Sequence, residues 1–123
     1  RILKGIPRVQ ALKNYLRMYR KRSGFTQKEL TFLLGCTHRS KVSRYERGVR
    51  MPALETVIGF EVVFRAPVAK LFAGTYAEVR ESIRSRARSL SKRLDAEPMT
   101  RATKQKLDAL VDVIHPPRGR EAA

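Results

Sequence analysis

The stretch GFTQKELTFLLG, residues 24–35, decides the fold of this chain. Thr26 is followed three residues later by Glu29, a pair that forms a capping box and satisfies two backbone amides at the start of a helix. Three leucines then supply an apolar side, and Gly35 is a natural stop. The stretch therefore predicts a helix of roughly nine residues that begins beside Thr26.

A second short helix follows closely. We predict that it runs from Ser40 to Arg47, is rich in basic side chains, and is closed by Gly48. Two short helices joined by a tight turn that contains glycine form a helix-turn-helix arrangement. In that arrangement the first helix braces across the DNA backbone while the second enters the major groove. The pattern thus favours a nucleic-acid-binding surface on the second helix.

Further helices are predicted on both sides of this pair, and no segment reads clearly as a strand. Upstream, apolar side chains recur with helical spacing from about Val9 to Ser23. Downstream, Met51-Pro52 marks the start of an apolar helix that ends near Arg65. A short element begins at Pro67, and we expect Gly74 to stop it. The fold class is therefore all-α: an N-terminal arm, residues 1–10, precedes a five-helix core, residues 11–74.

The sequence becomes more highly charged after Gly74. One apolar stripe recurs on an otherwise charged helix from 75 to 94, formed by Val79, Ile83, Ala87, Leu90 and Leu94. Pro98 breaks this helix, and a last helix ends near Ile114. Residues 75–114 are therefore predicted to form a helical hairpin, and residues 115–123 a disordered tail. The stripe suits either packing inside the hairpin or a seam between two chains.

The charge of the chain points to a polyanionic partner. The sequence contains 27 Lys and Arg residues but only 11 Asp and Glu residues, a formal charge of +16. Residues 1–66 carry 15 basic and 4 acidic side chains, net +11, whereas residues 67–123 carry 12 and 7, net +5. Such a charge raises the local concentration of polyanions. Nucleic acid is the first candidate and an anionic membrane surface the second, with the main contact on the first half. No apolar run approaches the roughly 18 residues of a membrane-spanning helix, and we expect no membrane partner.

Four features together resemble the Cro and phage-repressor (XRE) helix-turn-helix family over about residues 12–72. They are the run Thr26-Gln27-x-Glu29-Leu30, Gly35, the run Ser43-Arg44-Tyr45-Glu46-Arg47-Gly48, and Pro52. The resemblance implies a cytoplasmic transcriptional regulator of the bacterial cytosol or nucleoid, usually a repressor. It also implies double-stranded DNA as the partner and a homodimer as the common assembly.

The resemblance further implies roles for individual residues. Gln27, at the start of the first helix of the motif, would bond a DNA phosphate and brace a recognition side chain. The side chains expected to face bases or the DNA backbone are Arg39, Ser40, Lys41, Ser43 and Arg44, with Arg47 and Arg50 near phosphates. Arginine and lysine suit guanine O6 and N7, whereas serine is a less selective reader.

Glu46 is the one acid among these basic side chains. In the family this carboxylate pairs with an arginine near the end of the helix upstream of the motif, predicted here from about Val9 to Ser23, and that arginine corresponds to Arg20. We therefore expect a structural ion pair that orients the second helix of the motif, because phosphate would repel a carboxylate placed at the DNA.

The turn between Gly35 and Val42 is one residue longer than is usual in the family. Either the turn bulges at Thr37-His38 and leaves Ser40 as the helix cap, or the helix gains residues at its start. The register of the contacts at 38–41 depends on which of these holds.

The remaining chemistry of the sequence favours a binding protein over an enzyme. It contains no nucleophile–base pair, phosphate loop or carboxylate pair of catalytic spacing, so we expect no enzyme activity and no cofactor. His38 and His115 lie far apart, so no metal site is expected, and Cys36 is read as a small buried hydrophobe of a reducing compartment. Two other functions fit: an antitoxin-like protein whose C-terminal hairpin binds a partner protein, and a basic nucleic-acid-binding protein without sequence preference.

Overall fold

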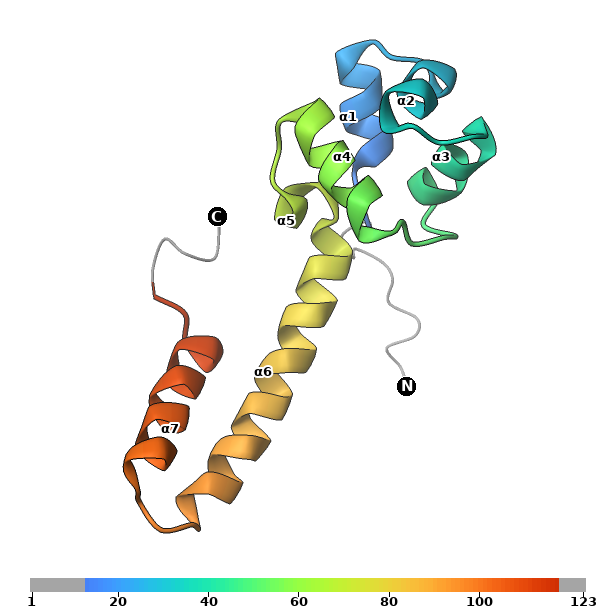
Figure 1. Cartoon of the computed structure of the whole chain (residues 1–123). Helices are drawn as coiled ribbons and strands as arrows, with labels where there is room; N and C mark the ends of the chain where they lie inside the picture. Colours follow the sequence, from blue (N-terminus) through green and yellow to red (C-terminus); the bar gives the residue numbers. More distant parts are fainter. Residues whose placement is uncertain (1–12, 118–123) are drawn as a thin grey trace. The chain divides into compact units, whose positions relative to one another are not determined.

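The computed structural model of the chain describes residues 13–117, and within that range α-helices are joined by turns without any strand. The all-α expectation is confirmed. The helices are α1 Leu16–Ser23, α2 Gln27–Leu34, α3 Arg39–Glu46, α4 Leu54–Phe64, α5 Val68–Leu71, α6 Ala73–Asp95 and α7 Arg101–Ile114 (Figure 1). The predicted arm, residues 1–10, lies outside the described residues, as do residues 118–123 of the predicted tail.

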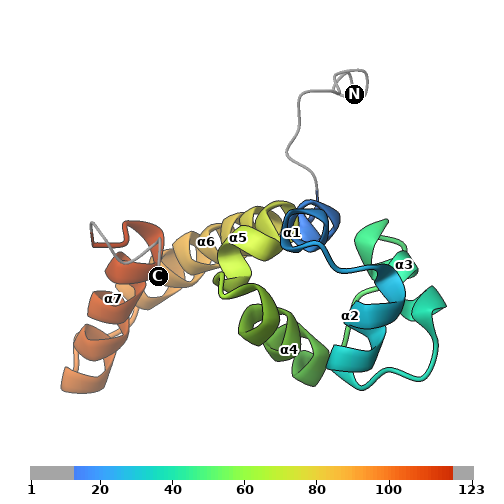
Figure 2. The same ribbon diagram turned by 90° about the horizontal axis from the view of Figure 1, so that it is seen from above.

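The described part of the chain divides into two compact units, with the boundary between Tyr76 and Ala77. The first unit holds α1 to α5 and the first residues of α6. In this unit α2 and α3 lie side by side in both views (Figure 1, Figure 2), while α1 contacts α3 and α4. Helix α4 also contacts α2 and α5, so all five helices enclose one core.

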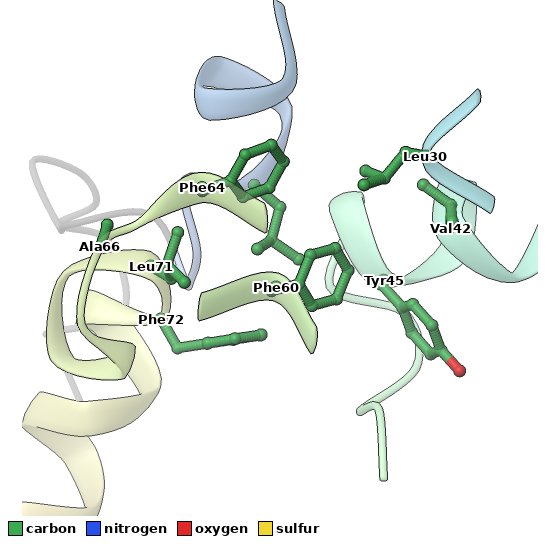
Figure 3. Close-up of a cluster of buried hydrophobic side chains, with 9 residues drawn as sticks. Leu30, Val42, Tyr45, Phe60, Phe64, Ala66, Leu71 and Phe72 are labelled. Atoms are coloured by element: carbon green, nitrogen blue, oxygen red, sulfur yellow. The ribbon is translucent and has the colours of Figure 1, made fainter. Parts of the chain in front are cut away.

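Phe60 of α4 is the centre of that core. Its side chain is fully buried, and its ring lies between Tyr45 of α3 on one side and Phe64 and Phe72 on the other (Figure 3). The ring centroids of these three neighbours lie 6.2, 6.1 and 6.1 Å from that of Phe60. Tilted and offset aromatic pairs at this separation add to the free energy gained by burying their surface. The core thus ties α3, the second helix of the motif, to α4.

Helix α1 begins later than predicted, at Leu16 rather than near Val9. Residues 9–12 lie outside the described range, and Lys13 to Tyr15 are not helical. Asn14 explains the start, because its Oδ1 accepts a hydrogen bond from the amide of Leu16 at 3.1 Å. The amide of Tyr15 instead donates to the carbonyl of Leu71 at 2.8 Å. Tertiary hydrogen bonds therefore replace the helical ladder at this end.

Two other predicted boundaries are wrong. Gly74 does not end the short helix that begins after Pro67 but lies in the first turn of α6. A glycine ends a helix by adopting a left-handed conformation, as Gly24 and Gly35 do at φ 83° and 72°, and Gly74 does not adopt it. Pro52 does not lie in the first turn of α4. The helix begins at Leu54 and Ala53 is its N-cap residue, so Pro52 precedes the cap.

The second unit contains α7 and the part of α6 from Ala77 onward, which run side by side in opposite directions (Figure 1). Pro98 lies in the turn between them, and the Thr100 hydroxyl accepts from the amide of Thr103 at the start of α7. The predicted apolar stripe of α6 is divided: Ala87 and Leu94 are buried, whereas its other three members are exposed. Two helices alone therefore cover only part of the stripe.

The central position of Phe60 leads to a prediction on stability. We expect Phe60→Ala to lower the free energy of unfolding by about 3–5 kcal/mol, because it removes a fully buried ring and leaves a cavity. Urea denaturation followed by circular dichroism measures this. The matched control is Phe32→Ala, which removes the same atoms from an exposed position and should change stability by less than about 0.5 kcal/mol. Equal losses in the two variants would contradict the assignment of Phe60 to the core.

Candidate nucleic-acid interface

The predicted capping box builds the start of α2. The Thr26 hydroxyl accepts a hydrogen bond from the amide of Glu29 at 3.0 Å, and the amide of Thr26 donates to Glu29 Oε1 at 2.9 Å. Gly35 ends the helix in a left-handed conformation, which lets the amide of Cys36 reach the carbonyl of Thr31 at 3.0 Å. These local bonds set where the chain leaves α2 and turns toward α3.

Of the two alternatives for the longer turn, the structure favours the one in which the helix gains residues at its start. The helix begins at Arg39, and His38 precedes it in an extended conformation without a capping side chain. Ser40 is therefore the second residue of the helix and not its cap. The additional residue places Arg39 and Ser40 on helical positions, which sets the register of every side chain that follows on α3.

One face of α3 is buried in the first unit. Val42 is fully buried and Tyr45 nearly so, and both belong to the hydrophobic core. Asn14 forms a hydrogen bond with the C-terminal end of α3, where its Nδ2 donates to the carbonyl of Tyr45 at 2.9 Å. Because Asn14 is itself buried, this bond holds the end of α3 against the start of α1.

Glu46 lies in a hydrogen-bonded network with α1 and α2. Its Oε2 accepts from Arg20 Nε at 2.6 Å, and its Oε1 accepts from Arg20 Nη2 at 3.2 Å and from Gln27 Nε2 at 3.1 Å. The side chains of Arg20 and Glu46 are only 11% and 3% exposed. Arg20 Nη1 also donates to the carbonyl of Phe25, in the turn before α2, at 3.1 Å. The carboxylate therefore faces the interior of the motif rather than the solvent.

The opposite face of α3 is open. Ser40, Ser43, Arg44 and Arg47 recur at i, i+3, i+4 and i+7 and so share one side of the helix. Arg44 and Arg47 are exposed, and Arg47 Nε donates to the Ser43 hydroxyl at 3.3 Å. Arginine donors and serine hydroxyls are thus presented along one outward line of a helix whose other side is fixed.

The other predicted contact residues lie on the two flanks of this line. A concave surface of about 630 Å³ next to α1 and α2 is lined by Gln27 and Arg39 together with Ser43 and Arg47. Lys41 and Arg50 line a separate concavity, beside the turn that follows α2. The predicted contact residues therefore lie on the open face of α3 and on its two flanks, with Lys41 and Arg50 on one flank and Gln27 on the other. We call this set of residues the basic band.

Three basic residues of the same concavity were missing from the sequence-based set. Arg17 and Lys21 of α1 and Lys28 of α2 line it with Gln27 and Arg39. Their signal was present in the sequence, because Arg17 and Lys21 are four residues apart and so project from one face of a helix. The sequence spacing could not show that this face of α1 borders α3.

Other kinds of site find no support in the described part of the chain. Between residues 13 and 117 no three His, Cys, Asp or Glu side chains gather in a group that could hold a metal ion. None of the helices described there is long and apolar enough to cross a membrane. Cys36 is only half-buried, so its environment is more open than the sequence suggested.

Comparison with known proteins gives one match. Residues 11–71 match a family model described as a helix-turn-helix domain, which spans α1 to α5 of the described chain. No curated protein and no solved structure matches the chain.

The buried network leads to a prediction for Glu46→Gln. This change keeps the size of the side chain but leaves the largely buried Arg20 guanidinium without its counter-charge, so we expect a loss of about 3–5 kcal/mol in unfolding free energy. Chemical denaturation measures the loss, and Glu97→Gln, which alters an exposed acid in the turn after α6, is the control. A Glu46→Gln protein that is as stable as wild type but has lost affinity for duplex DNA would refute the structural role.

Proposed function

The chain belongs to the helix-turn-helix family, and from that premise we propose that it is a sequence-specific regulator of transcription that binds double-stranded DNA through α3. In this proposal α3 enters the major groove with its line of arginine and serine side chains toward the base edges. Binding to an operator would exclude polymerase, which makes repression the proposed outcome.

The observation that carries the proposal is the division of α3 into a fixed face and an open one. Val42, Tyr45 and Glu46 hold the inner face through the core and the ion-pair network. The outer face is left with groups that suit DNA: Arg44 can donate two hydrogen bonds to guanine O6 and N7, and serine hydroxyls can bond to bases or phosphates. A rigidly held helix presents these groups without first having to order them.

The flanking basic residues suit the phosphate backbone. Arg17, Lys21 and Lys28 surround the concavity at the edge of the proposed contact, where sugar–phosphate strands would border the groove. Gln27 would serve twice, because its amide nitrogen has two hydrogens and only one points to Glu46. The second hydrogen is available for a phosphate oxygen.

We further propose that two copies act together on DNA. A pair related by a two-fold axis would read half-sites about 10 bp apart, or a multiple of that distance. Binding by charge alone, without sequence preference, is an outcome of the test below, whereas a role for the second unit in holding a partner protein stays a prediction from the sequence.

In vitro selection from random duplex DNA near physiological salt tests the proposal. We expect enrichment of one motif, bound more than about 10³-fold tighter than a scrambled duplex. A motif with two-fold symmetry would support the paired mode of action. Equal binding to every duplex would reject sequence reading and leave a basic protein attracted by charge alone.

Two variants distinguish residues that contact base edges from residues that contact phosphates. Arg44→Ala should cost about 1–3 kcal/mol on the selected site and relax the preference at particular base pairs. Arg17→Ala should weaken binding to all duplexes alike and lower the slope of log K against log salt by about 1. Titration of the selected and scrambled duplexes at several salt concentrations gives both results. If both variants behave alike, Arg44 is not a base reader.

A further inference from the structure

Helix α4 is apolar on two opposite sides. Phe60 and Phe64 point into the core, whereas Leu54, Ile58 and Val62 recur at i, i+4 and i+8 on the other side. These three side chains are 72%, 51% and 69% exposed. A helix that is apolar all round is normally buried all round, and a continuous exposed apolar strip marks an interaction surface. We call these three residues the α4 strip.

The α4 strip is bordered by acids. At 100° per residue, Glu55 and Glu61 project about 60° to either side of Ile58, so one carboxylate lies along each edge. The first 66 residues contain four acidic side chains, of which Glu46 is buried in the ion pair and Glu29, although exposed, is held in the capping box of α2. Glu61 is exposed as well, and its Oε1 accepts a hydrogen bond from the amide of Val68 at 3.2 Å. Two of the three exposed acids of the first unit, Glu55 and Glu61, therefore lie beside this strip.

The second unit has an apolar strip with the opposite charge. Val79, Ile83 and Leu90 of α6 are 55%, 46% and 38% exposed, because α7 covers a neighbouring face of the helix. Arg86 lies three residues after Ile83 and four before Leu90, so it projects within the same line and is exposed. We call these four residues the α6 strip. Its apolar surface is thus interrupted by a guanidinium.

Electrostatics decides which surfaces match. Pairing of two α4 strips would bring Glu55 and Glu61 against the same acids of the other copy, and pairing of two α6 strips would oppose Arg86 to itself. Like charges placed together at an interface cost several kcal/mol, whereas a positive surface facing a negative one favours association. The α4 strip and the α6 strip are complementary in both respects, since each is apolar along its line and opposite in charge.

We propose that two copies of this chain associate by packing the α4 strip of each copy on the α6 strip of the other. A two-fold axis makes this contact twice, so the α4 strip and the α6 strip of each chain are buried together. The inference rests on the proposed paired action in DNA binding, but the contact itself involves neither α3 nor its basic band.

Complementation between two variants of the full chain tests the contact without DNA. Ile58→Arg places a positive charge in the α4 strip, and Ile83→Glu places a negative charge in the α6 strip. Both side chains are about half exposed, so each variant should keep the helical circular dichroism of wild type. Light scattering after size exclusion, over a concentration series, gives the mass of each protein. Ser85→Glu, on the charged side of α6, is the matched control.

We expect wild type and Ser85→Glu to be dimers, and each of the two strip variants to raise the dimer dissociation constant by at least about tenfold. Mixing the two variants should restore association, because the mixed pair keeps one intact α4 strip facing one intact α6 strip. If only one variant dissociates, the corresponding strip pairs with itself and the proposal is wrong.

Monomeric wild type would also overturn the proposal, as would a mixture of the two variants that stays monomeric. Should either protein misfold, Val62→Arg and Val79→Glu replace the pair, because they alter the same strips at more exposed positions. Binding of the selected duplex by a monomeric variant, with lower affinity for the two-fold site, would leave the DNA function standing while the contact is judged separately.

Discussion

The hydrogen bonds of Arg20 with Glu46 are the constraint on which the DNA-binding unit depends. A single guanidinium joins the end of α1, the turn before α2 at Phe25 and the end of α3. Removing both charges from water is costly, and the cost is offset because the fork of donors meets both carboxylate oxygens. Since such a pair tolerates little displacement, it sets the position of α3 relative to α1 and α2.

The open face of α3 follows from this constraint. Once Glu46 points inward, the helical period sends Ser43, Arg44 and Arg47 outward. The core acts in the same direction, because Val42 and Tyr45 fill the space beside Phe60. Polar and apolar contacts therefore agree on one orientation of the helix, and that agreement keeps the basic band on the surface.

The two units handle apolar surface differently. The first has five helices around one aromatic core, yet α4 still has an apolar side left over. The second consists of two helices, which can bury only the stripe that lies between them. Exposed apolar surface of this kind favours association. In the proposed dimer, the acids beside the α4 strip and the guanidinium of the α6 strip would decide which surfaces pair.

The fold class and the order of the helices could be predicted from the sequence alone. The capping box at Thr26 and Glu29 and the glycines after α1 and α2 act within a few residues, so the all-α fold and the helix-turn-helix order could be predicted. The predicted helix boundaries were wrong where contacts between residues far apart in the sequence set the boundary. Asn14 starts α1 late because it also bonds Tyr45, and Gly74 continues into a helix although its residue type suggests a stop.

Only the tertiary structure decided how the basic residues are grouped. The sequence spacing could place Arg17 and Lys21 on one face of a helix, but not beside Arg39. It could propose the pairing of Arg20 with Glu46 through a family resemblance, but not the place of Gln27 in the same network. Local signals specify where helices begin and end, whereas the packing of one helix against another specifies which of their faces meet.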